Sequence, residues 1–154
     1  MTDTLSIFTI ASDCILGNHT RRMNSLLSEI QAQRSNEPLS RSANLPWKSE
    51  RQTHQFEWRK GHKGWLDIIR NDGKFIHAII VFQYPRLKLF SSPKKDWEVI
   101  NEVAQALYGE GKTVSTGSKT GKLFEKDKYK ILISCFKKNR QPCIEVKMAR
   151  EYFL

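Results

Sequence analysis

Two polar side chains, Asp67 and His77, interrupt apolar stretches of the chain and are of the types that acid–base chemistry uses. A carboxylate on an apolar face can act as a general base or hold a cationic group, and an imidazole titrates near neutral pH. The Asp-Gly pair at 72–73 predicts a tight turn, and pairing outward from it places Asp67 opposite Ala78 and His77 opposite Ile68. Since side chains alternate between the faces of a strand, the two polar groups are expected on opposite faces. They then form no acid–base pair, but either could line a pocket between sheet and helices.

Other fragments of catalytic or metal-binding motifs are incomplete. The segment 111–113 (Gly-Lys-Thr) has the end of a P-loop, but position 106, where the motif begins with glycine, is Ala106. His54, Glu57 and His62 are spread over a predicted strand and turn, which gives no common face for a metal ion. We therefore expect no catalytic residues, no metal and no cofactor. The sequence favours a non-enzymatic protein, although it leaves enzymatic activity open.

The net charge is the strongest signal in the composition. The chain has 154 residues, with 26 Lys+Arg against 16 Asp+Glu and a formal net charge of +10. The excess is uneven, because residues 111–154 hold eleven basic and four acidic residues and residues 21–70 hold ten and five, whereas residues 71–110 are balanced. A hydrophobic content of 39% is enough for a packed core, so this charge is expected on a folded surface.

Basic side chains gather at four places that could bind an anion. The predicted C-terminal hairpin carries a basic face and a basic tip, and two predicted helices begin with basic pairs, where the helix dipole disfavours positive charge unless an anion is bound. The candidate nucleic-acid or anion-binding residues are Lys128, Lys130 and Lys147 on the face, Lys137, Lys138 and Arg140 at the tip, and Arg21, Arg22, Lys94 and Lys95 at the helix starts.

Three tryptophans lie within the basic segment 21–70 and could stack nucleobases. They are Trp47, Trp58 and Trp65. Trp58 and Trp65 also have strand spacing with apolar neighbours, which is more typical of core residues than of a stacking surface.

The first twenty residues do not have the pattern of a secretory signal. They contain two aspartates and no Lys or Arg, and no apolar stretch of the chain approaches the length that spans a bilayer. Three cysteines without a CxxC pair suggest neither a disulfide framework nor a zinc site. These features predict a soluble cytoplasmic protein with reduced thiols and no membrane partner.

The periodicity predicts two helices. Met23, Leu26, Leu27 and Ile30 share one face of a helix over about 18–34. The second helix has Ser92 as cap, Pro93 at its first position and Gly109 after its end. Its expected buried stripe comprises Trp97, Ile100, Val103, Ala104 and Leu107.

Strands are predicted around these helices. The expected ranges are 5–10, 55–60, 64–70, 74–84, 128–136 and 142–148, with a long polar loop at 35–53 and a weak strand and flexible loop within 109–122. In the last hairpin, pairing Ile131 with Val146 leaves 138–139 as the turn and keeps Cys135 and Cys143 from facing each other. The pattern predicts a single α+β domain over 1–154 in the order β-α-β-β-β-α-β-β-β, with an antiparallel sheet of about six strands backed by two helices.

Three function classes fit these observations. The first is a small basic protein that binds nucleic acid through phosphates, with little sequence specificity, since no sequence-reading motif is present. The second is an interaction module, such as an antitoxin, inhibitor or accessory factor, that binds an acidic protein. The third is a small-molecule-binding or enzymatic domain with a pocket lined by Asp67 or His77. The sequence does not give the oligomeric state.

Overall fold

The protein is an α+β fold in which helices cover one face of a single antiparallel sheet. The computed structural model describes residues 3–35, 49–85, 93–116, 119–138 and 140–150. Within these residues the helices are α1 (Thr4–Gly17), α2 (Thr20–Glu29) and α3 (Pro93–Tyr108). The strands are β1 (Gln33–Ser35), β2 (Ser49–Arg59), β3 (His62–Asn71), β4 (Lys74–Gln83), β5 (Lys112–Thr116), β6 (Lys119–Lys126), β7 (Tyr129–Lys138) and β8 (Gln141–Arg150).

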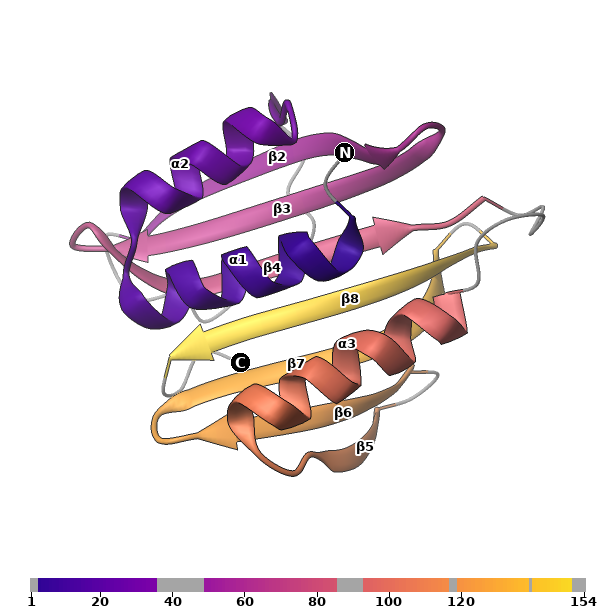
Figure 1. Ribbon diagram of the computed structural model, residues 1–154. Coiled ribbons are helices and arrows are strands. Elements are labelled where there is room, and N and C mark those ends of the chain that lie inside the picture. The colour runs from indigo at the N-terminus through magenta and orange to yellow at the C-terminus, as the bar shows by residue number, and fades with distance from the viewer. Residues whose placement is uncertain (1–2, 36–48, 86–92, 117–118, 139, 151–154) are drawn as a thin grey trace.

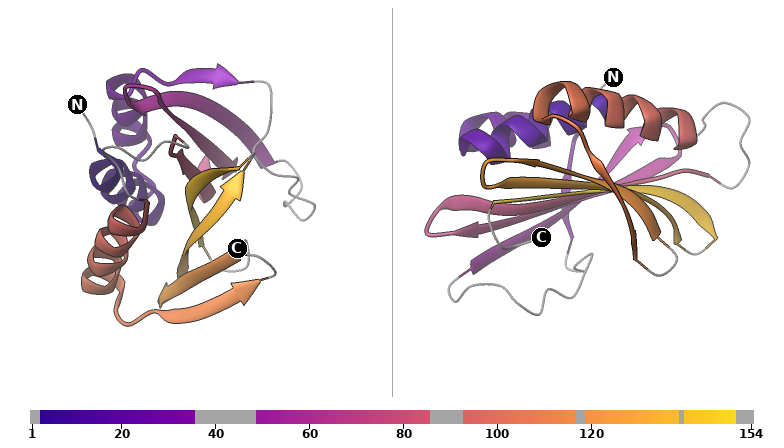
Figure 2. Two further views of the ribbon diagram at one scale, coloured as in Figure 1. Left: turned by 90° about the vertical axis from the view of Figure 1, so that its right-hand side faces the viewer. Right: turned by 90° about the horizontal axis from the view of Figure 1, so that it is seen from below.

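The described strands form one sheet in the order β1-β2-β3-β4-β8-β7-β6-β5. Each half of the sheet is four consecutive strands preceded by helix, and the halves meet where β4 pairs antiparallel with β8 (Figure 1). All three helices lie on one side of the sheet, and the sheet is strongly twisted (Figure 2). In the described part of the chain, no helix lies on the opposite side, which we call the open face.

The main core lies between the helices and the sheet. Strand alternation turns every second side chain of β3, β4, β7 and β8 toward the helices, whose apolar residues meet them. Fully buried members include Phe8, Ile15, Met23, Leu66, Ile80, Phe82, Ile100, Ile131 and Val146.

The predicted class is confirmed, but the element order is wrong at the N-terminus. Residues 5–10, expected as a strand, lie inside α1. Asp3 caps this helix by accepting a hydrogen bond from the backbone N–H of Ser6 at 2.8 Å. Because Ile7, Phe8, Ala11 and Ile15 recur at helical spacing and are all buried, packing outweighs the β-propensity of the segment.

The sheet is also larger than expected, with eight described strands instead of about six. The segment 109–122 contributes β5 and the start of β6, which pair from Lys112↔Leu123 to Thr116↔Lys119. β1 begins within the predicted helix and ends at Ser35, the first residue of the predicted 35–53 loop. The first residues of β2 also fall within that loop, while 36–48 lie outside the described residues.

The second predicted helix agrees closely with α3. It begins at Pro93, and Gly109 follows it with a positive φ of 89°, while the expected cap Ser92 lies outside the described residues. The buried stripe differs in part, because Leu107 is exposed and Tyr108 is buried. The predicted helix over 18–34 is shorter, since α2 ends at Glu29.

The C-terminal hairpin is shifted by two residues from the predicted register. Ile131 pairs with Met148 and not with Val146, and the strands remain paired out to Lys138↔Gln141. A shift of two leaves every side chain on its original face, so alternation alone does not distinguish the two registers. Cys135 pairs with Ile144, which confirms that Cys135 and Cys143 are not cross-strand partners.

Candidate functional site

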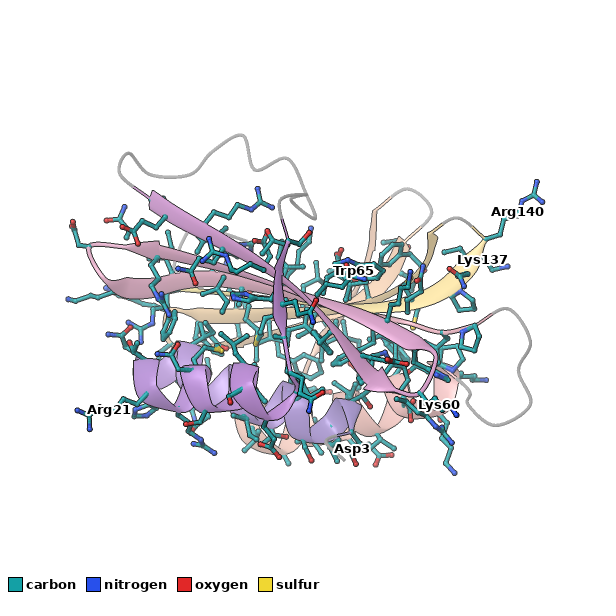
Figure 3. All side chains as sticks on the ribbon, turned by 90° about the horizontal axis from the view of Figure 1, so that it is seen from above. Asp3, Arg21, Lys60, Trp65, Lys137 and Arg140 are labelled. Carbon is teal, nitrogen blue, oxygen red and sulfur yellow. The ribbon has the colours of Figure 1, made fainter. Side chains whose placement is uncertain are left out.

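The open face contains the first candidate site residues. Cross-strand pairing aligns Thr53, Asp67, Ile79 and Lys147 in one row across β2, β3, β4 and β8. The neighbouring row runs from Ile69 of β3 through His77 of β4 and Ala149 of β8 to Lys130 of β7. Figure 3 shows Trp65 on this side of the sheet, away from the helices.

Asp67 and His77 lie on the same face, which corrects the predicted arrangement. The Asp72-Gly73 turn forms as expected, with positive φ at both residues, but the register shifts between Ile69 and Arg70. This bulge leaves Ile76 unpaired, so that Asp67 pairs with Ile79, and Ile69 pairs with His77. One extra residue in β4 therefore moves the imidazole to the side of the carboxylate.

Asp67 is a fully buried carboxylate whose two oxygens are both engaged. Arg51 donates from Nε to Oδ2 at 2.7 Å and from a second guanidinium nitrogen to the same oxygen. The Thr53 hydroxyl donates to Oδ1 at 2.9 Å. A paired and hydrogen-bonded buried carboxylate has a structural role, so we assign Asp67 to the fold and not to proton transfer.

His77 is 6% exposed, and its Nδ1 has no hydrogen-bond partner in the described part of the chain. Burial and, to a smaller extent, the Lys147 charge lower the pKa of His77 to about 4, while Asp67 opposes this shift. The imidazole is thus neutral at pH 7. Asp67 and His77 are close enough to interact electrostatically, but the carboxylate is already bound by Arg51.

Lys130 and Lys147 are both on the open face, on the side that the sequence predicts. Lys130 pairs with Ala149 and Lys147 with Leu132. The Lys147 ammonium lies 3.7 Å from a carboxylate oxygen of Glu145, and about a third of its side chain is exposed. The third predicted lysine of this face, Lys128, is instead exposed at the β6–β7 turn.

Two aromatic side chains lie on the same face as Lys130 and Lys147. Trp65 and Phe136 are half-buried and pack against a small apolar cluster of Ile79, Val81 and Cys143 on the open face. Trp58, by contrast, is in the main core, with its ring 5.0 Å from that of Tyr84. The prediction that Trp58 is a core residue is therefore confirmed, and Trp47 lies outside the described residues.

The start of α2 offers fewer cationic groups than its sequence suggests. Arg22 forms an ion pair with Asp13 of α1, while Arg21 projects from the molecule (Figure 3). Asn18, in the left-handed region with φ 55°, accepts a hydrogen bond from the Phe75 backbone N–H at 2.9 Å. Its side chain therefore holds the α1–α2 corner against β4.

The start of α3 and the β7–β8 tip meet around one hollow, which we call the tip pocket. Its volume is about 590 Å³, and its walls include Lys94, Trp97, Thr120, Cys135, Phe136 and Lys137. Lys94 and Lys137 are exposed at its rim. Lys95, which follows Lys94, and Arg140, which precedes β8, are also exposed. Lys138 is the last residue of β7. Figure 3 shows Lys137 and Arg140 projecting together at this end.

A second hollow, of about 750 Å³, lies at the other end of the sheet and has mixed charge. Asp72 and Asp127 line it together with four basic residues, Lys74, Lys126, Lys128 and Arg150. The tip pocket, in contrast, is lined by two lysines and by no acidic residue among the described ones. The two linings thus have the same excess of positive charge, and in the tip pocket no described carboxylate competes with an anion for the lysines.

The cysteines and the remaining histidines form no reactive cluster in the described residues. Burial raises the pKa of the Cys14 and Cys135 thiols to about 11, so both are protonated at neutral pH. No group of three or more His, Cys, Asp or Glu side chains in the described part of the chain could hold a metal ion. Nor is any described helix long and apolar enough to cross a membrane.

Comparison with known proteins gives no match: no family model, curated protein or solved structure is significantly similar to the chain. Function is therefore inferred from the side chains of the open face and of the tip pocket.

Sequence reasoning located the lysines of both surfaces but missed two features. It grouped no residue of α3 with the β7–β8 tip, because their meeting depends on how α3 lies across the sheet. It also rated Trp65, named as a possible stacking residue, as more typical of the core. The signal for an exposed role was its alternation with Leu66, which places the two side chains on opposite faces.

Proposed function

We propose that the protein binds single-stranded nucleic acid, with the strand lying on the open face and extending to the β7–β8 tip. The observation that carries this proposal is that Lys130, Lys147, Trp65 and Phe136 all lie on the face without described helices. Basic groups that bind phosphates next to aromatic rings that stack bases are the typical combination in proteins that bind single strands.

The charges on this face would supply the phosphate contacts. Lys147 has one carboxylate near it, at 3.7 Å, and Glu125 of β6 lies across from Lys130, while Asp67 is occupied by Arg51 and Thr53. The basic tip, with Lys137 and Arg140, continues the positive surface beyond Phe136. Such contacts are to the backbone of the strand, so we expect weak sequence preference and a strong dependence on salt.

The aromatic side chains favour a nucleic acid over an acidic protein. An acidic polypeptide would also be attracted to the lysines, but it has no bases to stack on Trp65. The two occupants therefore predict different effects of a substitution at this ring.

The experiment compares Trp65→Leu with the unaltered protein, because leucine keeps apolar contact with Ile79 and Val81 but has no π-face. Binding of a fluorescently labelled single-stranded oligonucleotide, measured by anisotropy, is expected to weaken about fivefold or more. The affinity for fluorescently labelled polyglutamate, measured in the same way, is expected to be unchanged. An oligonucleotide affinity equal to that of the unaltered protein would contradict the stacking role of the open face.

A further inference from the structure

The tip pocket has features that a phosphate-backbone surface does not need. It is a hollow of about 590 Å³ between the first turn of α3 and the ends of β6, β7 and β8. This volume lies within the range of small-molecule sites, and it exceeds what a simple ion contact requires. A ligand in this open hollow would contact side chains from several elements.

The charge of the pocket selects for an anion. Lys94 and Lys137 come from different elements, and neither has an acidic neighbour among the described residues that line the hollow. The acidic residue of the first turn of α3, Asp96, accepts a hydrogen bond from the Tyr84 hydroxyl at 2.6 Å. Lys94 and Lys95, in the first turn of α3, lie at the positive end of the helix dipole, and an anion held by Lys94 and Lys137 would reduce the resulting repulsion.

The walls of the pocket select for a flat apolar group. Trp97 is half-buried, and its indole N–H donates to the Ile133 carbonyl at 3.4 Å, which fixes the plane of the ring. Phe136 lines the pocket and also packs against the small apolar cluster of the open face. A ligand with an aromatic ring and an anionic group would use both the rings and the lysines.

We propose that the tip pocket binds one nucleotide unit, with its base among Trp97 and Phe136 and its phosphate between Lys94 and Lys137. This inference rests on the proposed function, since the strand on the open face would reach the pocket past Phe136. The unit bound there is the end of the strand, because the pocket is a hollow at the end of the sheet. The protein would thus recognise a phosphorylated strand end.

The test measures the affinity of the protein for three probes, which are adenosine 5′-monophosphate, adenosine and inorganic phosphate. Calorimetry and tryptophan fluorescence report the binding. The monophosphate is expected to bind at least about tenfold more tightly than either adenosine or inorganic phosphate, because only it uses both the rings and the lysines. Equal affinity for adenosine and its monophosphate would overturn the phosphate assignment, and equal affinity for inorganic phosphate would overturn the role of the rings.

Variants separate this pocket from the open face. Lys94→Ala/Lys137→Ala removes two exposed side chains and is expected to fold, and it should weaken monophosphate binding by about tenfold or more. Lys130→Ala/Lys147→Ala should bind the monophosphate like the unaltered protein. Trp97→Phe should remove the fluorescence change while keeping part of the affinity. Monophosphate binding that is unaffected by Lys94→Ala/Lys137→Ala would contradict the inference.

The same variants distinguish failure of this inference from failure of the proposed function. If the oligonucleotide binds and depends on Trp65, while the monophosphate does not bind, the pocket inference is wrong and the proposed function stands. If the monophosphate binds and the oligonucleotide does not, the pocket is a separate nucleotide site and its assignment to a strand end is wrong.

Discussion

Asp67 and His77 lie on the same face of the sheet, and the bulge at Ile76 is the reason. With unbroken pairing from the Asp72-Gly73 turn, the imidazole would have faced the helices. Instead it lies buried on the open face, near Asp67, Arg51 and Lys147, with a pKa lowered to about 4.

The position of His77 predicts a loss of stability in mild acid. Above pH 6.5 the imidazole is neutral in both folded and unfolded chains, so it contributes its full stability there. As the pH falls from 6.5 toward 4, the unfolded chain takes up a proton at His77 and the folded chain does not. The free energy of unfolding should therefore fall by up to about 3 kcal/mol over this range from His77 alone.

Urea unfolding of the protein and of His77→Leu at several pH values between 6.5 and 4 checks this expectation. The variant should lose less stability over the range than the unaltered protein. His54, which is buried on the helix side and also has a lowered pKa, remains in the variant and accounts for some residual pH dependence. Identical pH dependence of the two proteins would show that His77 is not buried as described.

The Arg51–Asp67 pair should be important to stability because its carboxylate is fully buried. Asp67→Ala leaves Arg51 and Thr53 without their acceptor and should destabilise the protein by about 3–5 kcal/mol. A double-mutant cycle with Arg51→Ala should give a coupling energy of about 2 kcal/mol.

The Arg22–Asp13 pair is the matched control for that cycle. Both of its side chains are about half exposed, so its coupling energy should stay below about 1 kcal/mol. Equal coupling in the two pairs would contradict the burial of Asp67.

Asn18 is expected to contribute to stability in two separable ways. Asn18→Ala loses both the favourable left-handed backbone and the hydrogen bond from Phe75, and it should cost about 2 kcal/mol. Asn18→Gly keeps the backbone conformation and loses the hydrogen bond, so it should cost about half as much. The free energy of unfolding, measured in urea, should therefore be lower for Asn18→Ala than for Asn18→Gly. The reverse order would show that Asn18 is not needed at the α1–α2 corner.

Much of the fold could be predicted from local signals. The Asp72-Gly73 turn, the apolar strand β4 and the end of α3 at Gly109 each have a strong signature within a few residues. The side on which Lys130 and Lys147 lie was also predictable, because alternation fixes a face even where the register is uncertain.

The errors arise where the local pattern allows two answers. α1 is rich in β-branched and aromatic residues, and its helical state depends on burial against β4, β8 and α3, although Asp3 and the spacing of Ile7, Ala11 and Ile15 were readable signals. The segment 112–126 has few apolar residues, because β5 is an edge strand, and so its strands left a weak signal.

The candidate site was less predictable than the fold. Nothing in the sequence near Ile76 marks a bulge, so the shared face of Asp67 and His77 could not be foreseen. The tip pocket joins residues of α3, β6, β7 and β8, and such a meeting depends on tertiary packing. Sequence reasoning found Lys94 and Lys137 separately but could not bring them together.

The most direct test of the central claim is the salt dependence of oligonucleotide binding. The affinity of a short single strand is measured over a series of salt concentrations for the unaltered protein, for Lys130→Ala/Lys147→Ala and for the control Lys122→Ala/Lys126→Ala. The control removes the same charge from the helix side of β6, where Lys122 pairs with the buried Ile133 and Lys126 with the buried Tyr129. If the strand lies on the open face, Lys130→Ala/Lys147→Ala should reduce the slope of log affinity against log salt by about 1.4, and the control should leave it nearly unchanged. Equal slopes for the two double variants would contradict binding at the open face.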